Sequence, residues 1–342
     1  MSLQFCGAAW VLLTVMACQV LPGEQPPSQP PPDARITGSP PNLGARTLGG
    51  VQLWSDQLVF HEWRIQQHAF THHFRLLDDR QARRARGTFQ QCHAALAKYK
   101  QELNLPPLAG KVVVLLHGLA RSRGSLDGLA AYFRAHSDYL VLNVSYASTR
   151  HEIGRHAESL ASVIHHLPEV DEVNFVAHSM GNLVVRHYLA DRKDLANSVP
   201  CDRIGRVVML APPNQGSILA QKFRDVSAFQ LLSGSGGRQI ANWESLTGNL
   251  TTPSCEFGII AGGTGQKRGY NPLIKGDNDL VVAVAETKLA GARDFAVVPC
   301  WHTTLMDNPL VREYTLRFLQ HGYFRSPAER TPITETPDAP SG

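Results

Sequence analysis

The residue whose surroundings point most directly to chemistry is Ser179. It lies in the pentapeptide Ala177-His178-Ser179-Met180-Gly181, between an apolar run typical of a buried strand and a stretch typical of a helix. A sharp strand-to-helix turn lifts a serine hydroxyl out of the sheet, and its crowding requires small residues two positions before and two after the serine. Ala177 and Gly181 meet that requirement, and His178 should point away from the hydroxyl. The alternative is a serine that only caps a helix, which needs no partners elsewhere.

A nucleophilic serine needs a general base and a carboxylate that orients the base, here expected in the chain order Ser, acid, His. His302 follows the last predicted strand and is the predicted base. The loop after the preceding predicted strand contains two carboxylates, Asp277 and Asp279. We favour Asp279 because it directly precedes an apolar run. Asp277, in Gly-Asp-Asn, is typical of a turn and remains the alternative acid.

Such a reaction also needs backbone N–H donors for the oxyanion that forms in its transition state. The predicted strand 111–116 is followed at once by His117-Gly118-Leu119, where Gly118 permits a close approach of the backbone. The expected donors are the amides of Leu119 and Met180. His117 is expected to be structural, because the backbone rather than the imidazole would act there.

Six short runs rich in Val, Ile and Leu predict strands, and helical patterns fill most of the gaps between them. The predicted strands are 111–116, 139–144, 173–177, 206–210, 256–261 and 294–298. The predicted helices are 125–136, 152–166, 179–191 and 311–320. Near-continuous apolar strands separated by helices predict an α/β fold with a mostly parallel central sheet and helices on both faces. Ligands bind such sheets at the carboxyl ends of the strands, where the candidate residues lie.

On these residues the sequence resembles the α/β-hydrolase superfamily, and within it the bacterial lipases and esterases. The resemblance is carried by the AHSMG turn, the HGL loop, the APPNQGS segment at 211–217 and the GDNDLVV segment at 276–282. The same segments resemble the related lipases that act on acyl chains of glycolipid anchors, and Ala177 replaces the family's usual Gly. The resemblance implies an α/β-hydrolase fold and a cofactor-independent acyl-enzyme mechanism, with Ser179, Asp279 and His302 as the triad.

The expected function is hydrolysis of carboxylic esters by a lipase or carboxylesterase, with an ester or lipid as the substrate. An acyltransferase or thioesterase with the same triad is the first alternative, and a non-catalytic binding module on the same scaffold is the second. No metal is expected because no Cys or His spacing is typical of zinc. A net charge of +4 over 342 residues is too weak for a nucleic-acid partner.

The first 50 residues are predicted to contain an export segment followed by a tether. Residues 1–21 carry no charged side chain and are mostly apolar, which predicts an export signal or N-terminal anchor, and hence membrane association through the N-terminus. Val-Met-Ala-Cys at 15–18 resembles a lipoprotein box with Cys18 as the lipidated residue. The protein is therefore expected in the cell envelope or secreted. Eight prolines in 22–50 predict an extended, disordered tether.

The predicted hydrolase domain spans 51–325, and 326–342 is expected to be a disordered tail. Within the domain, 51–105 is an N-terminal extension expected to contain a hairpin and a helix over 80–101, with Arg80, Arg83, Arg84 and Arg86 on a solvated face. The irregular segment 217–254 is long enough to form a lid. The body contains Cys92, Cys201, Cys255 and Cys300, which predict one or two disulfides in an oxidising compartment.

Overall fold

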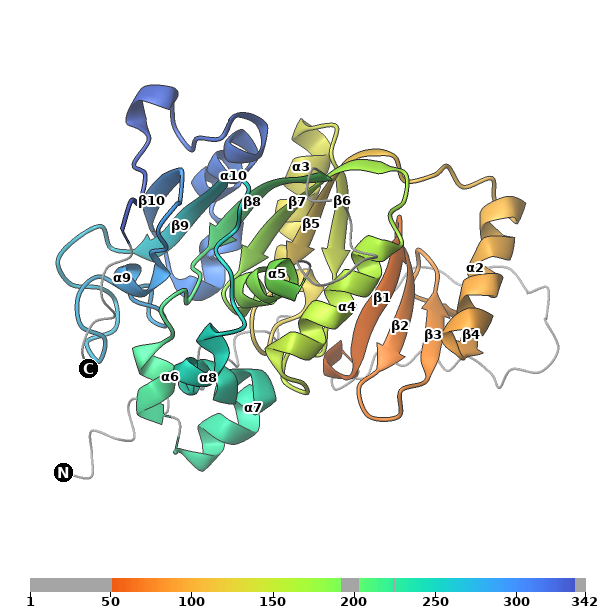
Figure 1. Cartoon of the computed structure of the whole chain (residues 1–342), viewed down its shortest axis with the longest axis horizontal. Helices are drawn as coiled ribbons and strands as arrows, with labels where there is room; N and C mark the ends of the chain where they lie inside the picture. Colours follow the sequence, from red (N-terminus) through yellow and green to blue (C-terminus); the bar gives the residue numbers. More distant parts are fainter. Residues whose placement is uncertain (1–50, 192–202, 224, 336–342) are drawn as a thin grey trace, which may run out of the picture. The chain divides into compact units, whose positions relative to one another are not determined.

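A computed structural model of the chain describes residues 51–191, 203–223 and 225–335, so the predicted export segment and tether lie outside the described residues. Six strands form one parallel sheet in the order β10-β9-β8-β7-β5-β6 (Figure 1). They are β5 (Gly110–Leu116), β6 (Leu140–Val144), β7 (Val170–His178), β8 (Ile204–Leu210), β9 (Phe257–Gly263) and β10 (Asp294–Pro299). Each matches a predicted strand, which confirms the parallel sheet.

Helices cover both faces of this sheet because side chains alternate along its strands. On β5, Val112 and Val114 join one apolar core, whereas Val113 and Leu115 join the other. The first core is closed by α4 (Ile153–His165) and α5 (Met180–Asp191), and the second by α3 (Asp127–His136) and α10 (Pro309–His321). Figure 1 shows the first pair in front of the sheet and the second pair behind it. The predicted α/β class with both faces covered is thus confirmed.

A second, antiparallel sheet precedes the parallel one, in the order β1-β2-β3-β4. Its strands are β1 (Trp54–Phe60), β2 (Trp63–His68), β3 (Phe74–Leu77) and β4 (Arg83–Gly87), and helix α2 (Phe89–Glu102) packs against β3 and β4. The expected hairpin is therefore half of a larger sheet. These strands were missed because polar residues interrupt β1 and β2, while β3 and β4 are only 4 and 5 residues long.

The predicted helix over 80–101 begins nine residues later than expected, at Phe89. Thr88 caps it, with its hydroxyl accepting from the Gln91 amide and the Gln91 side chain accepting from the Thr88 amide, a reciprocal cap that fixes the start of a helix. Arg83, Arg84 and Arg86 consequently lie on β4, at the edge of the antiparallel sheet, and not on a helix face. Charged side chains on an edge strand discourage pairing with another chain.

The two sheets are joined by the buried carboxylate of Asp56 on β1. It accepts hydrogen bonds from Arg64 Nη1 at 2.6 Å, Gln66 Nε2 at 2.8 Å and the Ser145 amide at 2.7 Å. The Asp56 amide in turn donates to the Ser145 carbonyl at 2.9 Å. Asp56 and Arg64 are 0% and 1% exposed. Because Ser145 directly follows β6, its two hydrogen bonds with Asp56 fix β1 to the edge of the parallel sheet.

The segment expected to form a lid contains three helices, α6 (Ile218–Phe223), α7 (Ser227–Ala241) and α8 (Trp243–Thr247), here called the cap (Figure 1). Helix α7 kinks at Gly234, whose φ of 60° and ψ of −153° are open essentially to glycine alone. A Cβ on Gly234 would collide with the Thr149 carbonyl, and one on Gly236 would lie 2.8 Å from Met180 Sδ. The kink therefore rests on the loop after β6 and on the residue that follows Ser179.

Residues 326–335 do not form the expected disordered tail. The Thr331 amide donates to Asp294 Oδ1 at 2.9 Å, and the Ile333 amide donates to the Ala292 carbonyl at 3.0 Å. Ile333 also packs against the apolar core. One apolar residue and a buried carboxylate thus anchor a stretch whose composition is otherwise typical of disorder. Residues 336–342 lie outside the described residues.

The cysteines do not form the two disulfides that the sequence allowed. Cys92 and Cys300 are free thiols, and Cys201 lies outside the described residues. Burial raises the pKa of Cys92 to about 11, so its thiol stays protonated and unreactive. Across 51–191, 203–223 and 225–335, every helix is too short or too polar to cross a lipid bilayer.

The joint between the sheets gives a stability prediction. Asp56→Asn leaves the buried Arg64 guanidinium with only the half-exposed Glu62 carboxylate, 3.9 Å away, as a counter-charge, so the free energy of unfolding should fall by about 3 kcal/mol. Glu158→Gln removes one partner of the exposed Arg155–Glu158 pair, in which the two side chains are 48% and 61% exposed, and should cost less than about 1 kcal/mol. Urea unfolding followed by circular dichroism measures both. Equal losses in the two variants would contradict the assigned role of Asp56.

Candidate active site

Ser179 occupies the sharp turn between β7 and α5, with a φ of 53° that is rare for residues other than glycine. Its amide donates to the Leu210 carbonyl at 2.9 Å, and its carbonyl accepts from the Asn182 amide at 3.0 Å. A Cβ on Gly181 would lie 2.8 Å from the carbonyl oxygens of both Leu116 and His117. The expected need for a small residue at this position therefore has a specific cause, which is contact with the end of β5.

The structure brings together the three side chains that the sequence singled out. His302, at the start of a short 3₁₀ helix after β10, has its Nε2 2.9 Å from Ser179 Oγ. Its Nδ1 lies 2.7 Å from Asp279 Oδ2. An ionised carboxylate can only accept, so Nδ1 carries the proton and Nε2 is free to accept from the serine hydroxyl. His302 and Asp279 are 6% and 0% exposed.

Asp279 is held by its own loop in a way that leaves one oxygen for His302. Its Oδ1 accepts from the amides of Val281 at 3.0 Å and Val282 at 2.8 Å. The His302 amide also donates to the Asp279 carbonyl at 2.9 Å, so main chain and side chain both connect the two residues. These bonds fix the orientation of the carboxylate.

Asp277, the alternative acid, has a different role. Its Oδ1 accepts from the Thr264 amide at 2.7 Å and the Thr264 hydroxyl at 2.9 Å, and its Oδ2 accepts from the Gly265 amide at 2.9 Å. These bonds close the turn after β9 and use both oxygens. The geometry thus favours Asp279 as the partner of His302.

The predicted oxyanion donors lie on two segments in close contact. A Cβ on Gly118 would lie 3.0 Å from Ser179 Cβ, so only glycine lets the loop after β5 approach the turn this closely. Among the described residues, no oxygen accepts from the Leu119 amide. Met180 begins α5, and first-turn amides of a helix have no acceptor within it. Both amides are thus available to an oxygen bound beside Ser179 Oγ.

Two histidines near the serine are kept neutral by burial. Burial lowers the pKa of His117 to about 4; its Nδ1 donates to the Gly118 carbonyl at 2.9 Å and its ring stacks on Tyr146 at 4.2 Å. This is the structural role expected of His117. Burial, followed by the nearby His302, also lowers the pKa of His178 well below its usual value.

His178 has a function in the architecture that the sequence did not indicate. Its Nε2 donates to the main-chain carbonyl of His302 at 3.0 Å, and the two ring centroids are 4.6 Å apart. The residue before the serine therefore supports the backbone of the residue that faces the serine hydroxyl. A spacing argument cannot find such a contact, because 124 positions separate the two residues.

A second missed residue is Glu286, a carboxylate only 1% exposed. Its Oε1 accepts from the Ile218 amide at 2.5 Å and its Oε2 from the Ala283 amide at 2.7 Å. Ile218 is the first residue of α6, so Glu286 connects the start of the cap to the segment that follows Asp279. Burial, with a smaller contribution from the nearby Asp279, raises the pKa of Glu286 to about 7.

Arg186 of α5 fixes the two ends of the cap segment. It is 6% exposed, and burial lowers its pKa to about 10. Its Nε donates to the Thr251 carbonyl at 2.9 Å and its Nη1 donates to Asn214 Oδ1 at 3.1 Å. Asn214 precedes the cap and Thr251 follows it. No motif in the sequence distinguishes this arginine from a surface residue.

The described residues contain no group of three or more His, Cys, Asp or Glu side chains arranged to hold a metal ion. In the His-rich stretch, His68 and His73 stack at 5.3 Å, and the Thr71 hydroxyl lies 3.0 Å from His68 Nδ1. Both rings also meet Trp54 edge-on. These histidines are thus engaged in local packing.

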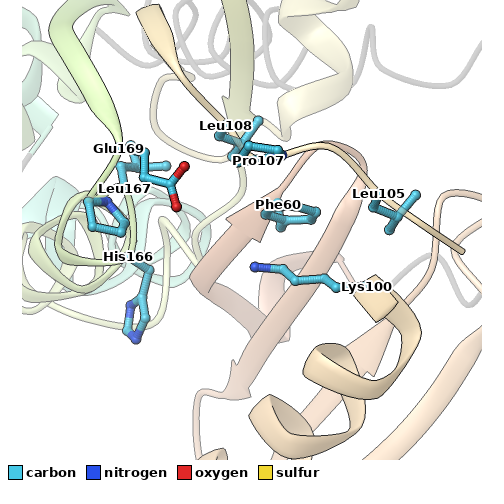
Figure 2. Close-up of a pocket in the computed structure, with 9 residues that line it drawn as sticks. Phe60, Lys100, Leu105, Pro107, Leu108, His166, Leu167 and Glu169 are labelled. Atoms are coloured by element: carbon cyan, nitrogen blue, oxygen red, sulfur yellow. The ribbon is translucent and has the colours of Figure 1, made fainter. Parts of the chain in front are cut away.

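A pocket of about 230 Å³ lies away from Ser179 (Figure 2). It is bounded by Leu108, just before β5, and by Glu169, just before β7, with Lys100 Nζ 3.5 Å from the centroid of the Phe60 ring. These positions are the amino ends of the strands. Substrates of parallel sheets bind at the opposite edge, where Ser179, Asp279 and His302 converge.

Comparison with protein families matches residues 80–241 to a domain of unknown function, DUF7379. Comparison with curated proteins gives no match. Among solved structures, the phospholipase PlaB from Legionella pneumophila is 17% identical with a TM-score of 0.48, over 62% of this chain and 60% of that one. The mature lipase BlEst2 from Bacillus licheniformis is 16% identical with a TM-score of 0.47, over 63% and 94%. The lin2722 product from Listeria innocua is 14% identical with a TM-score of 0.45, over 66% and 98%.

The α/β-hydrolase fold is evident in the chain itself. Six parallel strands are covered by helices on both faces, and the sharp turn with a positive φ at Ser179 follows β7 in the middle of the sheet. The loop after β5 packs against that turn. This combination is the α/β-hydrolase arrangement.

Glu286 gives a prediction for the dependence of stability on pH. Its pKa is 4.5 in an unfolded chain and about 7 in the fold, so the native state holds the extra proton between these values. Below pH 4.5 Glu286 makes its whole contribution to the free energy of unfolding. This contribution falls by about 3 kcal/mol as pH rises to 7 and above. Glu286→Gln cannot ionise and should remove this decline.

Urea unfolding at pH 5 and pH 8 measures the effect, as the difference between wild type and variant. Glu244→Gln, at an exposed position in α8, controls for the loss of one carboxylate from the cap. If the free energy of unfolding falls equally in Glu286→Gln and in wild type between the two pH values, burial does not raise the pKa of Glu286.

Proposed function

We propose that the protein is a serine hydrolase of carboxylic esters, a lipase or carboxylesterase that acts through a Ser-His-Asp triad. The observation that carries this proposal is the continuous hydrogen-bond chain from Ser179 Oγ through His302 to Asp279, with distances of 2.9 Å and 2.7 Å. A serine that only caps a helix would have no reason to contact a histidine 123 positions away.

In the first half-reaction, Ser179 Oγ forms a bond with the ester carbonyl carbon while its proton passes to His302 Nε2. The carbonyl oxygen becomes an oxyanion, which accepts hydrogen bonds from the amides of Leu119 and Met180. The bond to the leaving alcohol then breaks, and His302 returns the proton to the alkoxide. An acyl-enzyme remains on Ser179.

In the second half-reaction, water replaces the alcohol. His302 takes a proton from the water as its oxygen bonds to the acyl carbon, and returns it to Ser179 Oγ as the free acid leaves. Asp279 stays ionised throughout and stabilises the imidazolium that forms in each half. Its two backbone hydrogen bonds keep it from rotating away from His302 Nδ1.

The substrate's acyl group is proposed to lie beneath the cap. The kink of α7 rests on Met180 and on the loop after β6, directly beside the reacting hydroxyl. Gly236 of α7 approaches Met180 Sδ, and the buried Ile240 and Ala241 follow on the same helix, so we propose that the cap contributes an apolar wall. An apolar wall next to the nucleophile suits the acyl part of an ester or lipid.

The proposal includes a location outside the cytoplasm. The apolar segment 1–21 supports export, with Cys18 as a site of lipidation in the cell envelope. Membrane fractionation of wild type and Cys18→Ala distinguishes a lipid anchor from secretion.

The triad is tested by paired carboxylate variants. Asp279→Asn should lower kcat for p-nitrophenyl butyrate by about 10⁴-fold, because His302 loses its orienting partner. The matched control Asp277→Asn should keep kcat within about tenfold of the wild-type value, because this substitution affects only a turn. Ser179→Ala should lower kcat by at least about 10³-fold, and this variant should no longer react with a fluorophosphonate probe. Full activity of Ser179→Ala would exclude the mechanism.

The two alternative functions give different outcomes in the same assays. A non-catalytic binding module would leave Ser179 unlabelled by the fluorophosphonate in the wild type. An acyltransferase would convert the substrate into a new ester when a competing alcohol is added, whereas a hydrolase yields free acid. A thioesterase would prefer thioesters to the matched oxygen esters.

The position of the cap gives a selectivity prediction. Gly234→Ala forces a Cβ against the Thr149 carbonyl and strains the kink by about 1–3 kcal/mol, so α7 must shift above the acyl site. The ratio of kcat/KM for long-chain to short-chain p-nitrophenyl esters should change by about tenfold, or 1.4 kcal/mol. Gly248→Ala is the control, because a Cβ there meets nothing within 4 Å. An unchanged ratio would show that the cap does not contact the acyl chain.

A further inference from the structure

Large apolar side chains are exposed on the two loops that carry Asp279 and His302. Trp301, which precedes it, is 53% exposed, and Tyr270 and Leu273 on the loop after β9 are 36% and 44% exposed. The rings of Tyr270 and Trp301 meet edge-to-face with centroids 6.4 Å apart. These residues come from two separate loops, and both loops carry members of the triad or their neighbours. The apolar group therefore lies at the rim of the active site.

The loop that carries Tyr270 and Leu273 is rigidly built, so their exposure is not a result of looseness. Asn278, 0% exposed, accepts from the Asn271 amide at 2.8 Å and donates to the Asn271 carbonyl at 3.1 Å. The Asn271 side chain donates in turn to the Leu280 carbonyl at 2.8 Å. Since Asn278 adjoins Asp279, the same bonds fix the loop relative to the triad. Apolar side chains held outward by an ordered loop indicate a binding surface.

The part of the loop after β9 that spans 264–277 carries a net positive charge. Residues 264–277 contain three cations, Lys267, Arg268 and Lys275, all exposed. Their one carboxylate, Asp277, is occupied by hydrogen bonds to Thr264 and Gly265. Lys222 of α6 adds a fourth cation, and its Nζ donates to the Leu273 carbonyl at 3.1 Å.

We propose that this rim surface, composed of Tyr270, Leu273, Trp301, Lys222, Lys267, Arg268 and Lys275, docks on an anionic lipid surface. Amphipathic aromatic rings and lysines over apolar groups suit the boundary between lipid headgroups and acyl chains. Basic side chains are attracted to anionic headgroups. The inference deepens the proposed ester hydrolysis, because docking here would bring the active-site rim against its lipid substrate.

Charge favours a lipid surface over a second copy of the chain as the occupant. In a two-fold contact each copy presents the same patch, so the cations of one rim would face those of the other. An anionic headgroup layer instead complements all four cations while accepting the apolar side chains. The occupant is therefore identified by both parts of the surface.

Binding is measured with the full chain carrying Ser179→Ala, so that lipid is not consumed. Binding of each variant is measured by co-sedimentation with vesicles of phosphatidylcholine, either alone or with added phosphatidylglycerol. The triple variant Lys267→Gln/Arg268→Gln/Lys275→Gln should bind the anionic vesicles about 100-fold more weakly, from about fivefold per charge. The control Lys98→Gln/Lys111→Gln/Arg155→Gln removes the same charge elsewhere and should change binding by less than about threefold.

The apolar part is tested separately. Tyr270→Ser/Leu273→Ser should weaken binding to both vesicle types by about tenfold or more. Leu103→Ser, at a residue 54% exposed just after α2, is the control and should have no effect. Brominated lipids should quench tryptophan fluorescence in the parent chain, and Trp301→Phe should remove part of that quenching.

Failure of the docking proposal is distinguishable from failure of the proposed function. With Ser179 intact, the rim variants should hydrolyse soluble p-nitrophenyl butyrate within about threefold of wild type and lose activity only on vesicles. Absence of hydrolysis in the wild type would refute the proposed function. Vesicle binding would still test the docking proposal, because it is measured without catalysis. Equal vesicle binding by rim and control variants overturns the docking proposal. So does a dimer that Leu273→Ser dissociates without changing vesicle binding.

Discussion

The structure depends on the close contact between the start of α5 and the end of β5. Helix α5 leaves the sheet immediately after β7, and Gly181 in its first turn touches the carbonyls of Leu116 and His117. Any side chain at this position would push the helix away from the sheet. Because the helix stays close, Ser179 is forced to a positive φ and its hydroxyl is directed out of the sheet.

The other parts of the site are arranged around that one turn. The loop after β5 contacts this turn through Gly118, and the segment after β10 contacts it through His302. Burial keeps His117 and His178 neutral, so neither adds a positive charge beside the imidazolium that would form on His302. Asp279 and His302 are connected twice, through side chains and through main chain. Among the described residues, Asp279 is thus the carboxylate that bonds to the His302 ring.

The sequence predicts the parallel sheet well because both of its faces are buried. Strands such as β5 and β7 must then be apolar at nearly every position, and such runs are easily recognised. Ser179, Asp279 and His302 could be found for a related reason, since each lies in the segment that follows one of those strands, β7, β9 or β10. The choice of Asp279 over Asp277 came from its position before an apolar run.

The parts that the sequence did not predict depend on contacts between distant residues. The strands β1 and β2 contain several polar residues, and the five-residue β4 carries three arginines, so its sequence shows no two-residue period that would distinguish it from a polar helix. Glu286 and Arg186 look like surface charges until the fold buries them against main-chain groups of the cap segment. Ile333 anchors a stretch of otherwise polar sequence in the same way. Local composition contains no information about such partners.

Arg186 has a consequence for how this protein can diversify. It lies on the helix that begins at the residue after Ser179, and it holds Asn214 and Thr251 at the two ends of the segment between β8 and β9. The span between these two anchors can therefore be lengthened, shortened or replaced while its attachment points keep their places relative to α5 and Ser179. Selection for new substrates can act on this span as an exchangeable module, with the reacting groups unchanged beneath it.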